Sequence, residues 1–299
     1  NNAVSGTLTR TSTTGAFYLY YNNGSPTGTE IISGNDFQNI SQSGTSTFLG
    51  IYSYTESGHT HQVNNNTIAN ISSGSGAFIA IDLGTSDYRN IYNNTIRNIS
   101  TGGTVDVVKL GTGNSICHIY KNQITNISTS STSTTQGFFN GMLIAYGTAV
   151  YVYNNFISDL KASIVSNSDA IRAISITSTQ ANSYIGLYYN SVFLNASSSG
   201  ANFGSTAVYH VSGSATTAML DMRNNILVNT STPAGSGRAV VLRRTNSGLL
   251  NFAEGSDNNI LYAGTPGSSR VIYYAASGYQ TLSDYQAHVA PREGNSHTE

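Results

Sequence analysis

The chain is organised by an Asn-containing unit that recurs eight times. A clear copy reads Asn94-Thr95-Ile96-Arg97-Asn98-Ile99-Ser100. The first Asn of each copy is found in the following series: Asn35, Asn66, Asn94, Asn122, Asn155, Asn190, Asn225 and Asn259. Neighbouring members are separated by 31, 28, 28, 33, 35, 35 and 34 residues, by subtraction of these positions. A repeat of this length predicts a solenoid in which each copy forms one coil.

Apolar side chains keep fixed places around this Asn. The position two residues after it is apolar in every copy: Phe37, Ile68, Ile96, Ile124, Ile157, Val192, Leu227 and Leu261. The position three residues before it is apolar in all but the last copy, and the alternation between such positions has a period of two. That period indicates short strands with one buried face.

Each repeat holds two further strands, one between successive Asn copies and one after the Asn. Examples of the former are Phe78–Asp82 and Val105–Leu110, and this strand occurs nine times. Three strands per repeat predict an all-β fold, a parallel β-helix of about nine coils, each of roughly 30 residues.

The recurring Asn suits a sharp bend between two strands. Asn tolerates a left-handed backbone, and its amide can donate to one coil and accept from the next. We therefore expect the eight residues to form a structural Asn ladder. The Asn-Ile-Ser triplets also match the N-glycosylation pattern, at Asn39, Asn70, Asn98 and Asn126. That pattern matters only if the host glycosylates Asn.

Composition excludes several function classes. Only 9% of the residues are charged and the net charge is −1, which argues against nucleic-acid partners and anionic membrane surfaces. No apolar stretch is long enough for a membrane span. The single cysteine, Cys117, rules out an internal disulfide. The polar start contains no signal peptide, which suggests a mature or trimmed end, or a cut inside a longer protein.

The end of the chain differs from the repeats. Residues 282–289 predict a short helix that stops before Pro291. The Tyr-Asn-Asn-x-Ile-x-Asn-Ile-Ser coils, the stretch Asp257–Tyr262 and the Leu-x-x-Tyr-Gln helix together resemble secreted parallel β-helix proteins of Bacteroidota, within the pectate-lyase-like superfamily. This resemblance and the crossover rule imply a right-handed helix, and the resemblance implies a secreted or cell-surface location. We expect one domain over residues 1–299, a fragment of a longer surface protein without a terminal cap.

The resemblance also raises an enzymatic alternative, because the superfamily contains polysaccharide lyases and glycoside hydrolases. Alignment on the Gly-Thr turns places Asp82 and Lys109 in one outward column on adjacent coils, with Tyr52 one coil earlier. These two residues are weak catalytic candidates, since a cross-strand ion pair is the better explanation of their pairing and a lyase base is the alternative. The other acidic residues are scattered along the chain, which disfavours an enzyme.

A metal site has little support. His59, His61 and His118 could gather on one face, but no further ligand with suitable spacing accompanies them. We expect no metal and no cofactor.

Tyrosine is the more prominent functional signal, with 20 Tyr and no Trp. Tyr92, Tyr120, Tyr153 and Tyr188 each lie two residues before a repeated Asn, on the outward face, and Tyr52 and Tyr54 lie on another strand. Such rings can stack on one another or contact sugars and proteins. The leading hypothesis is a non-catalytic extracellular adhesin, a stalk or filament subunit. Its partners are a polysaccharide or cell-surface glycan, or further copies joined into a fibre through open solenoid ends.

Overall fold

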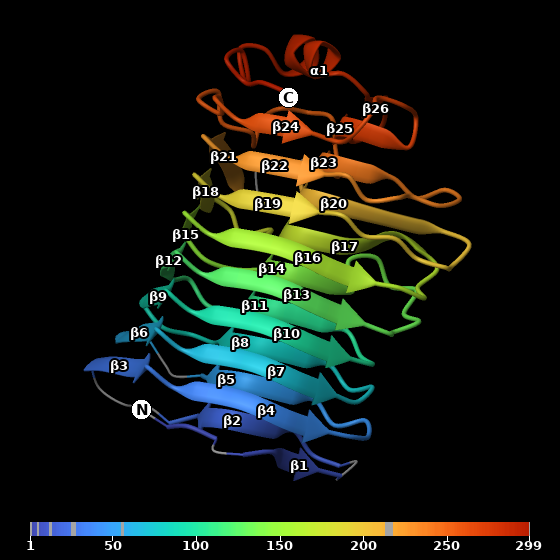
Figure 1. The fold of residues 1–299 in the computed structure, drawn as a ribbon. Helices are drawn as coiled ribbons and strands as arrows, with labels where there is room; N and C mark the ends of the chain where they lie inside the picture. Colours follow the sequence, from blue (N-terminus) through green and yellow to red (C-terminus); the bar gives the residue numbers. More distant parts are fainter. Residues whose placement is uncertain are drawn as a thin grey trace.

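The protein is a parallel β-solenoid of about eight turns with one short helix at its C-terminal end. The computed structural model describes residues 2–4, 6–11, 14–24, 28–54, 57–212 and 218–298. Figure 1 shows the coils stacked from the N-terminal end, in blue, to the C-terminal end, in red. The predicted all-β parallel solenoid is therefore confirmed.

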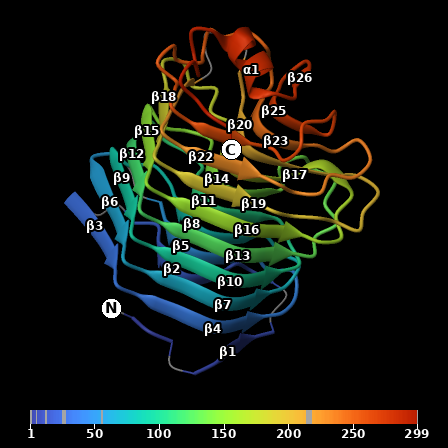
Figure 2. The same cartoon turned by 45° about the horizontal axis from the view of Figure 1, so that its top comes forward.

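Three sheets form the walls of the solenoid, and successive strands from β3 to β23 belong to them in the order C, A, B (Figure 2). Sheet A contains β1 (Leu8–Arg10), β4 (Asp36–Gln42), β7 (Thr67–Ser73), β10 (Thr95–Thr101), β13 (Gln123–Thr129), β16 (Phe156–Ala162), β19 (Ser191–Leu194), β22 (Ile226–Asn229) and β24 (Ile260–Tyr262). Sheet B contains β2 (Phe17–Asn22), β5 (Phe48–Ser53), β8 (Phe78–Leu83), β11 (Val105–Leu110), β14 (Phe139–Ile144), β17 (Asn167–Ile176), β20 (Phe203–His210), β23 (Ala239–Arg244), β25 (Arg270–Tyr274) and β26 (Gly278–Tyr279). Sheet C contains β3 (Gly28–Ser33), β6 (His59–Asn64), β9 (Tyr88–Tyr92), β12 (Ile116–Tyr120), β15 (Ala149–Tyr153), β18 (Tyr184–Tyr188) and β21 (Met219–Arg223).

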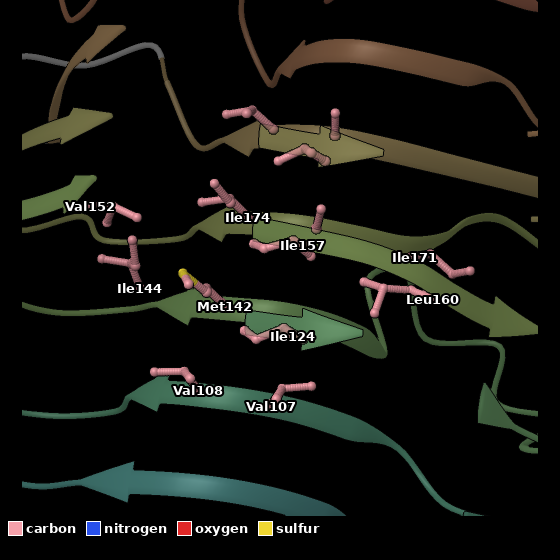
Figure 3. Packing of buried hydrophobic residues seen from close by; sticks show 14 of the residues in the cluster. Val107, Val108, Ile124, Met142, Ile144, Val152, Ile157, Leu160, Ile171 and Ile174 are labelled. Atoms are coloured by element: carbon pink, nitrogen blue, oxygen red, sulfur yellow. The ribbon is translucent and has the colours of Figure 1, made fainter. Parts of the chain in front are cut away.

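Equivalent apolar residues stack along the solenoid axis. Ile96 pairs in register with Ile68 on one side and with Ile124 on the other. Figure 3 shows such side chains pointing into the interior, among them Val108 and Met142 from neighbouring strands of sheet B and Ile124 from sheet A. These columns form one continuous core, because each coil buries its apolar face against the next.

The predicted Asn ladder is present and buried. All eight of its members are at most 6% exposed. The Nδ2 of Asn94 donates to Oδ1 of Asn122 at 2.9 Å, and the backbone N–H of Asn94 donates to the same oxygen at 3.1 Å. The second Nδ2 hydrogen donates to the carbonyl of Val63 in the preceding coil at 2.9 Å. We call this series the inner ladder.

The bend is built one residue earlier than the sequence suggested. None of the eight inner-ladder residues has a positive φ. The left-handed residue precedes each of them: Gly34, Asn65, Asn93, Lys121, Asn154, Tyr189, Asn224 and Asn258, with φ between 55° and 67°. The expectation that the ladder Asn itself adopts the left-handed backbone is therefore wrong.

A second series of Asn residues lies on the outside of the solenoid. Asn39, Asn70, Asn98 and Asn126 all have a left-handed backbone, with φ from 53° to 57°. Their amides also form a chain, with Nδ2 of Asn126 donating to Oδ1 of Asn98 at 2.9 Å. These residues, which carry the glycosylation pattern, are exposed or half-buried, and we call them the outer ladder.

The C-terminal coil is covered, contrary to expectation. Helix α1 (Leu282–Val289) is capped at its N-terminus by Thr281, whose hydroxyl accepts a hydrogen bond from the N–H of Asp284. Tyr285 and Val289 of the helix are fully buried in the core. Figure 1 shows α1 lying over the last coil. Nowhere in the described residues is there a helix long and apolar enough for a membrane crossing.

Candidate functional site

The predicted Asp82–Lys109 column lies on the outer face of sheet B. Asp82 and Lys109 are register partners on β8 and β11, and Lys109 Nζ lies 3.3 Å from Asp82 Oδ2. The Tyr54 hydroxyl donates to the other carboxylate oxygen at 3.0 Å, and Tyr52 pairs with Asp82 in register. Burial raises the pKa of Asp82, while the Lys109 charge and these hydrogen bonds act to lower it.

The Tyr rings beside this column cover one another. Tyr52 stacks on Tyr21 with ring centroids 5.4 Å apart, and on Tyr54 at 4.5 Å. Both faces of the Tyr52 ring are therefore occupied, and the Tyr54 hydroxyl is bonded to Asp82.

The predicted Tyr column on sheet C forms a stack of three rings. Tyr92 and Tyr120 are 4.9 Å apart and tilted by 4°, and Tyr120 and Tyr153 are 4.8 Å apart and tilted by 2°. Parallel rings at this spacing cover each other's facing sides, so Tyr120 is covered on both faces and Tyr92 and Tyr153 on one face each. The Tyr188 hydroxyl instead forms a hydrogen bond with the Tyr184 hydroxyl at 2.6 Å and donates one to Asp221 at 3.0 Å.

The three histidines do not converge. His59 and His61 lie on β6, whereas His118 lies on β12, and β9 separates these strands. His61 is fully buried and lies 3.4 Å from Glu30, while His118 stacks on Tyr151 at 5.1 Å. No group of three or more potential metal ligands among His, Cys, Asp and Glu occurs in the described part of the chain.

A depression of about 360 Å³ lies farther along the outer face of sheet B, where the sequence predicted no site. It is bordered by β11, β14, β17 and the segment before β14. Its lining comprises Thr104, Asp106, Thr135, Gln136, Gly137, Phe138, Asn140, Leu143, Arg172, Ser175 and Thr177. We call it the sheet B depression.

Three side chains give the sheet B depression its chemistry. Asn140 Nδ2 donates to Asp106 Oδ1 at 2.7 Å and to the Gly137 carbonyl at 2.9 Å. Burial raises the pKa of Asp106, although the bond from Asn140 and the charge of Lys109 lower it. A carboxylate, an amide and the Arg172 guanidinium thus line one depression.

Arg172 is held rigidly from three sides. Its Nε and Nη2 donate to Asp169 Oδ2 at 3.0 and 2.8 Å. Its Cζ lies 3.4 Å from the centre of the Tyr209 ring. Gly137, at φ +62°, lies so close that a Cβ there would be 2.5 Å from Cζ, so a larger residue would displace the guanidinium. The group is therefore fixed before any ligand arrives.

This arrangement had no sequence signal, because residues three apart on a regular strand point to opposite faces. The register of β17 against β20 shifts between Asn167 and Ile171, and this irregularity allows Asp169 and Arg172 to meet.

Two further arginines, Arg238 and Arg243, lie at β23, two coils beyond β17. Arg243 Nε lies 3.4 Å from Asp169 Oδ1 and donates to the Thr206 hydroxyl at 3.1 Å. The Arg243 and Arg238 guanidinium carbons lie 4.8 and 4.7 Å from the centre of the Tyr274 ring. Arg172 and Arg243 therefore share the Asp169 carboxylate, and Arg238 adds a further positive charge beside Tyr274.

No protein-family model, curated protein or solved structure matches this chain. The strand pairing alone therefore identifies the fold as a parallel solenoid. The likeness to the pectate-lyase-like superfamily is one of repeat pattern only.

Proposed function

We propose that this chain is a non-catalytic extracellular module that binds a glycan in the sheet B depression. The observation that carries the proposal is the convergence of Asp106, Asn140 and Arg172 in one depression of about 360 Å³. Sugar hydroxyls both donate and accept hydrogen bonds, so fixed carboxylate, amide and guanidinium groups suit them. Because Arg172 is already immobilised, binding costs little side-chain entropy there.

The neighbouring side chains favour an extended ligand. Lys109 and Asp82 continue the polar surface toward the N-terminal coils, and Tyr209 and Arg243 continue it toward the C-terminal coils. Adjacent strands are about 4.8 Å apart, so a chain lying along the solenoid axis meets a new set of side chains on each coil. A secreted or cell-surface location, expected from the repeat style, suits such a ligand.

The sheet C tyrosines are a weaker choice for sugar contact. Sugars stack on exposed ring faces, whereas stacking covers both faces of Tyr120 and one face each of Tyr92 and Tyr153. Their regular stack favours a stiffening role in a stalk. Growth of a fibre by adding coils at the C-terminal end is disfavoured, because α1 covers that end.

The first test measures binding to a panel of neutral and acidic polysaccharides. Gln136→Ala changes a loop residue of the depression without touching the buried pairs, and Arg172→Ala removes the clamped guanidinium. We expect each variant to weaken binding at least tenfold. Tyr92→Ala combined with Tyr120→Ala is the matched control and should bind as the unmodified chain does. Loss of binding in the control alone would overturn the proposal. Circular dichroism of each variant checks folding.

A polysaccharide lyase or hydrolase is the second candidate. The observation that favours it is the presence of Asp82, Asp106 and Lys109 on adjacent strands, with the pKa of both carboxyls raised by burial. An enzyme would release reducing ends or unsaturated uronates from the bound polysaccharide. It would also lose that release in Asp106→Asn while retaining binding.

A further inference from the structure

The inner ladder ends on a carboxylate. In the preceding coils, the N–H and Nδ2 of each ladder Asn donate to Oδ1 of the next. At Asn259, the N–H donates to the Ser296 hydroxyl at 2.9 Å and Nδ2 donates to Glu293 Oε2 at 2.9 Å. The Ser296 hydroxyl donates in turn to the same Glu293 oxygen. Glu293 and Ser296 thus replace the Asn that a further coil would supply.

Glu293 is buried without a cationic partner. It is fully inaccessible to solvent, and no ion pair to it occurs among the described residues. The adjacent Arg292 donates instead to the carbonyls of Phe252, at 2.8 Å, and Val289, at 3.3 Å. A buried carboxylate in this situation is costly to ionise.

The other titratable groups around Glu293 do not neutralise it. Asp257, which precedes β24, adds negative charge, and Tyr285 of α1 faces the carboxyl group. The positive charges of Arg244 and Arg292 also reach Tyr285, while His288 stacks on Tyr279 and His297 acts on Asp257. Glu293 Oε1 and the Tyr285 hydroxyl are both buried and lack a hydrogen bond. The Tyr285 hydroxyl can donate to an ionised Oε1 and so lowers the pKa of Glu293, but it brings no positive charge to offset the burial of the carboxylate.

We propose that Glu293 is a proton-controlled latch, whose protonated form holds α1 and residues 290–298 closed over the last coil and whose ionised form loosens them. The latch goes beyond the glycan-binding function and does not depend on it. Opening would uncover the donors of Asn259 and the strand edges of the last coil, which could then pair with another chain.

The direction of the pH effect follows from the pKa of Glu293. Burial, together with a smaller effect of the Asp257 charge, raises that pKa from 4.5 to about 7, despite the hydrogen bonds from Ser296, Asn259 and Tyr285. In the open state the pKa returns to its ordinary value, so the closed state holds the proton more tightly. The latch therefore contributes its full stability below pH 4.5 and loses it as the pH rises through 7.

Hydrogen exchange of the full chain tests this proposal. After correction for intrinsic exchange rates, α1 and residues 291–298 should open roughly ten- to a hundredfold more at pH 8 than at pH 5. Exchange in β10 and β13, far from the cap, should not change. Glu293→Gln keeps the shape and removes the titration, so this variant should stay closed at both pH values.

Asp284→Asn is the control, because Asp284 is an exposed acid at the start of α1. This variant should keep the pH dependence of the unmodified chain. Three outcomes overturn the latch: no pH dependence in the unmodified chain, the same dependence in Glu293→Gln, or a cap that is open at both pH values in Glu293→Gln.

Discussion

The inner and outer Asn ladders use the same residue and the same amide-to-amide hydrogen bond in different surroundings. The inner ladder is buried and runs through all eight repeats. The outer ladder faces solvent and ends after four members, with Asp159 at the next equivalent position, also left-handed. Only the buried series persists along the chain.

The two ladders differ in whether other groups can replace the hydrogen bonds of a lost Asn side chain. Asn122 Oδ1 accepts from the N–H and Nδ2 of Asn94, and its Nδ2 donates to the Ile91 carbonyl and to Asn155. Removing this side chain leaves several buried polar groups without hydrogen-bond partners. Each such group lowers the stability of the fold by about 1–3 kcal/mol. Water can replace the bonds of the outer ladder, so burial rather than residue type determines the stabilisation.

The largest expected effect comes from breaking the inner ladder. Asn122→Ala should lower the free energy of unfolding by about 3 kcal/mol or more, because the buried groups that lose their hydrogen bonds have no access to water. Denaturant titration monitored by circular dichroism measures it. A loss below about 1 kcal/mol would contradict the burial argument.

A smaller effect should appear at the bend. Lys121 holds a left-handed backbone at φ 56°, where five of the other repeats have Asn. Lys121→Asn should therefore raise the free energy of unfolding by about 0.5–1 kcal/mol through relief of that strain. Gln123→Asn, on the exposed face of β13, is the matched control and should give no gain. Equal gains in unfolding free energy for both variants would show that relief of backbone strain is not the cause.

The smallest effect is expected in the outer ladder. Asn126→Gly deletes the exposed amide and tolerates φ 53°, so the unfolding free energy should change by less than about 0.5 kcal/mol. Asn126→Ala should lose about 1 kcal/mol more, since Ala is strained there. If Asn126→Gly costs as much as Asn122→Ala, the two ladders are equivalent and the comparison fails.

Much of the fold could be predicted because each coil repeats its constraints. Eight Asn residues and the apolar columns around them define the strands and their register. The bend was misplaced by one residue because Asn occupies both positions in several repeats, as in Asn93-Asn94. Lys121 and Tyr189 adopt the left-handed backbone despite their side chains, which local preference does not predict.

Less of the candidate site than of the fold could be predicted from the sequence. Asp82 and Lys109 were aligned correctly because regular turns flank their strands. Asp169 and Arg172 were missed because an irregular register on β17 brings them together. The Tyr column was placed correctly, but a column position does not specify whether the ring faces are open or stacked. Contacts between side chains of neighbouring coils decide that.

The most direct measurement of the central claim is hydrogen-exchange protection of the full chain with and without a bound oligosaccharide. The account predicts new protection on β11, β14 and the segment before β14, around the sheet B depression, and none on β9, β12 and β15. Protection confined to the sheet C tyrosine strands, or binding without protection at the depression, would contradict the account.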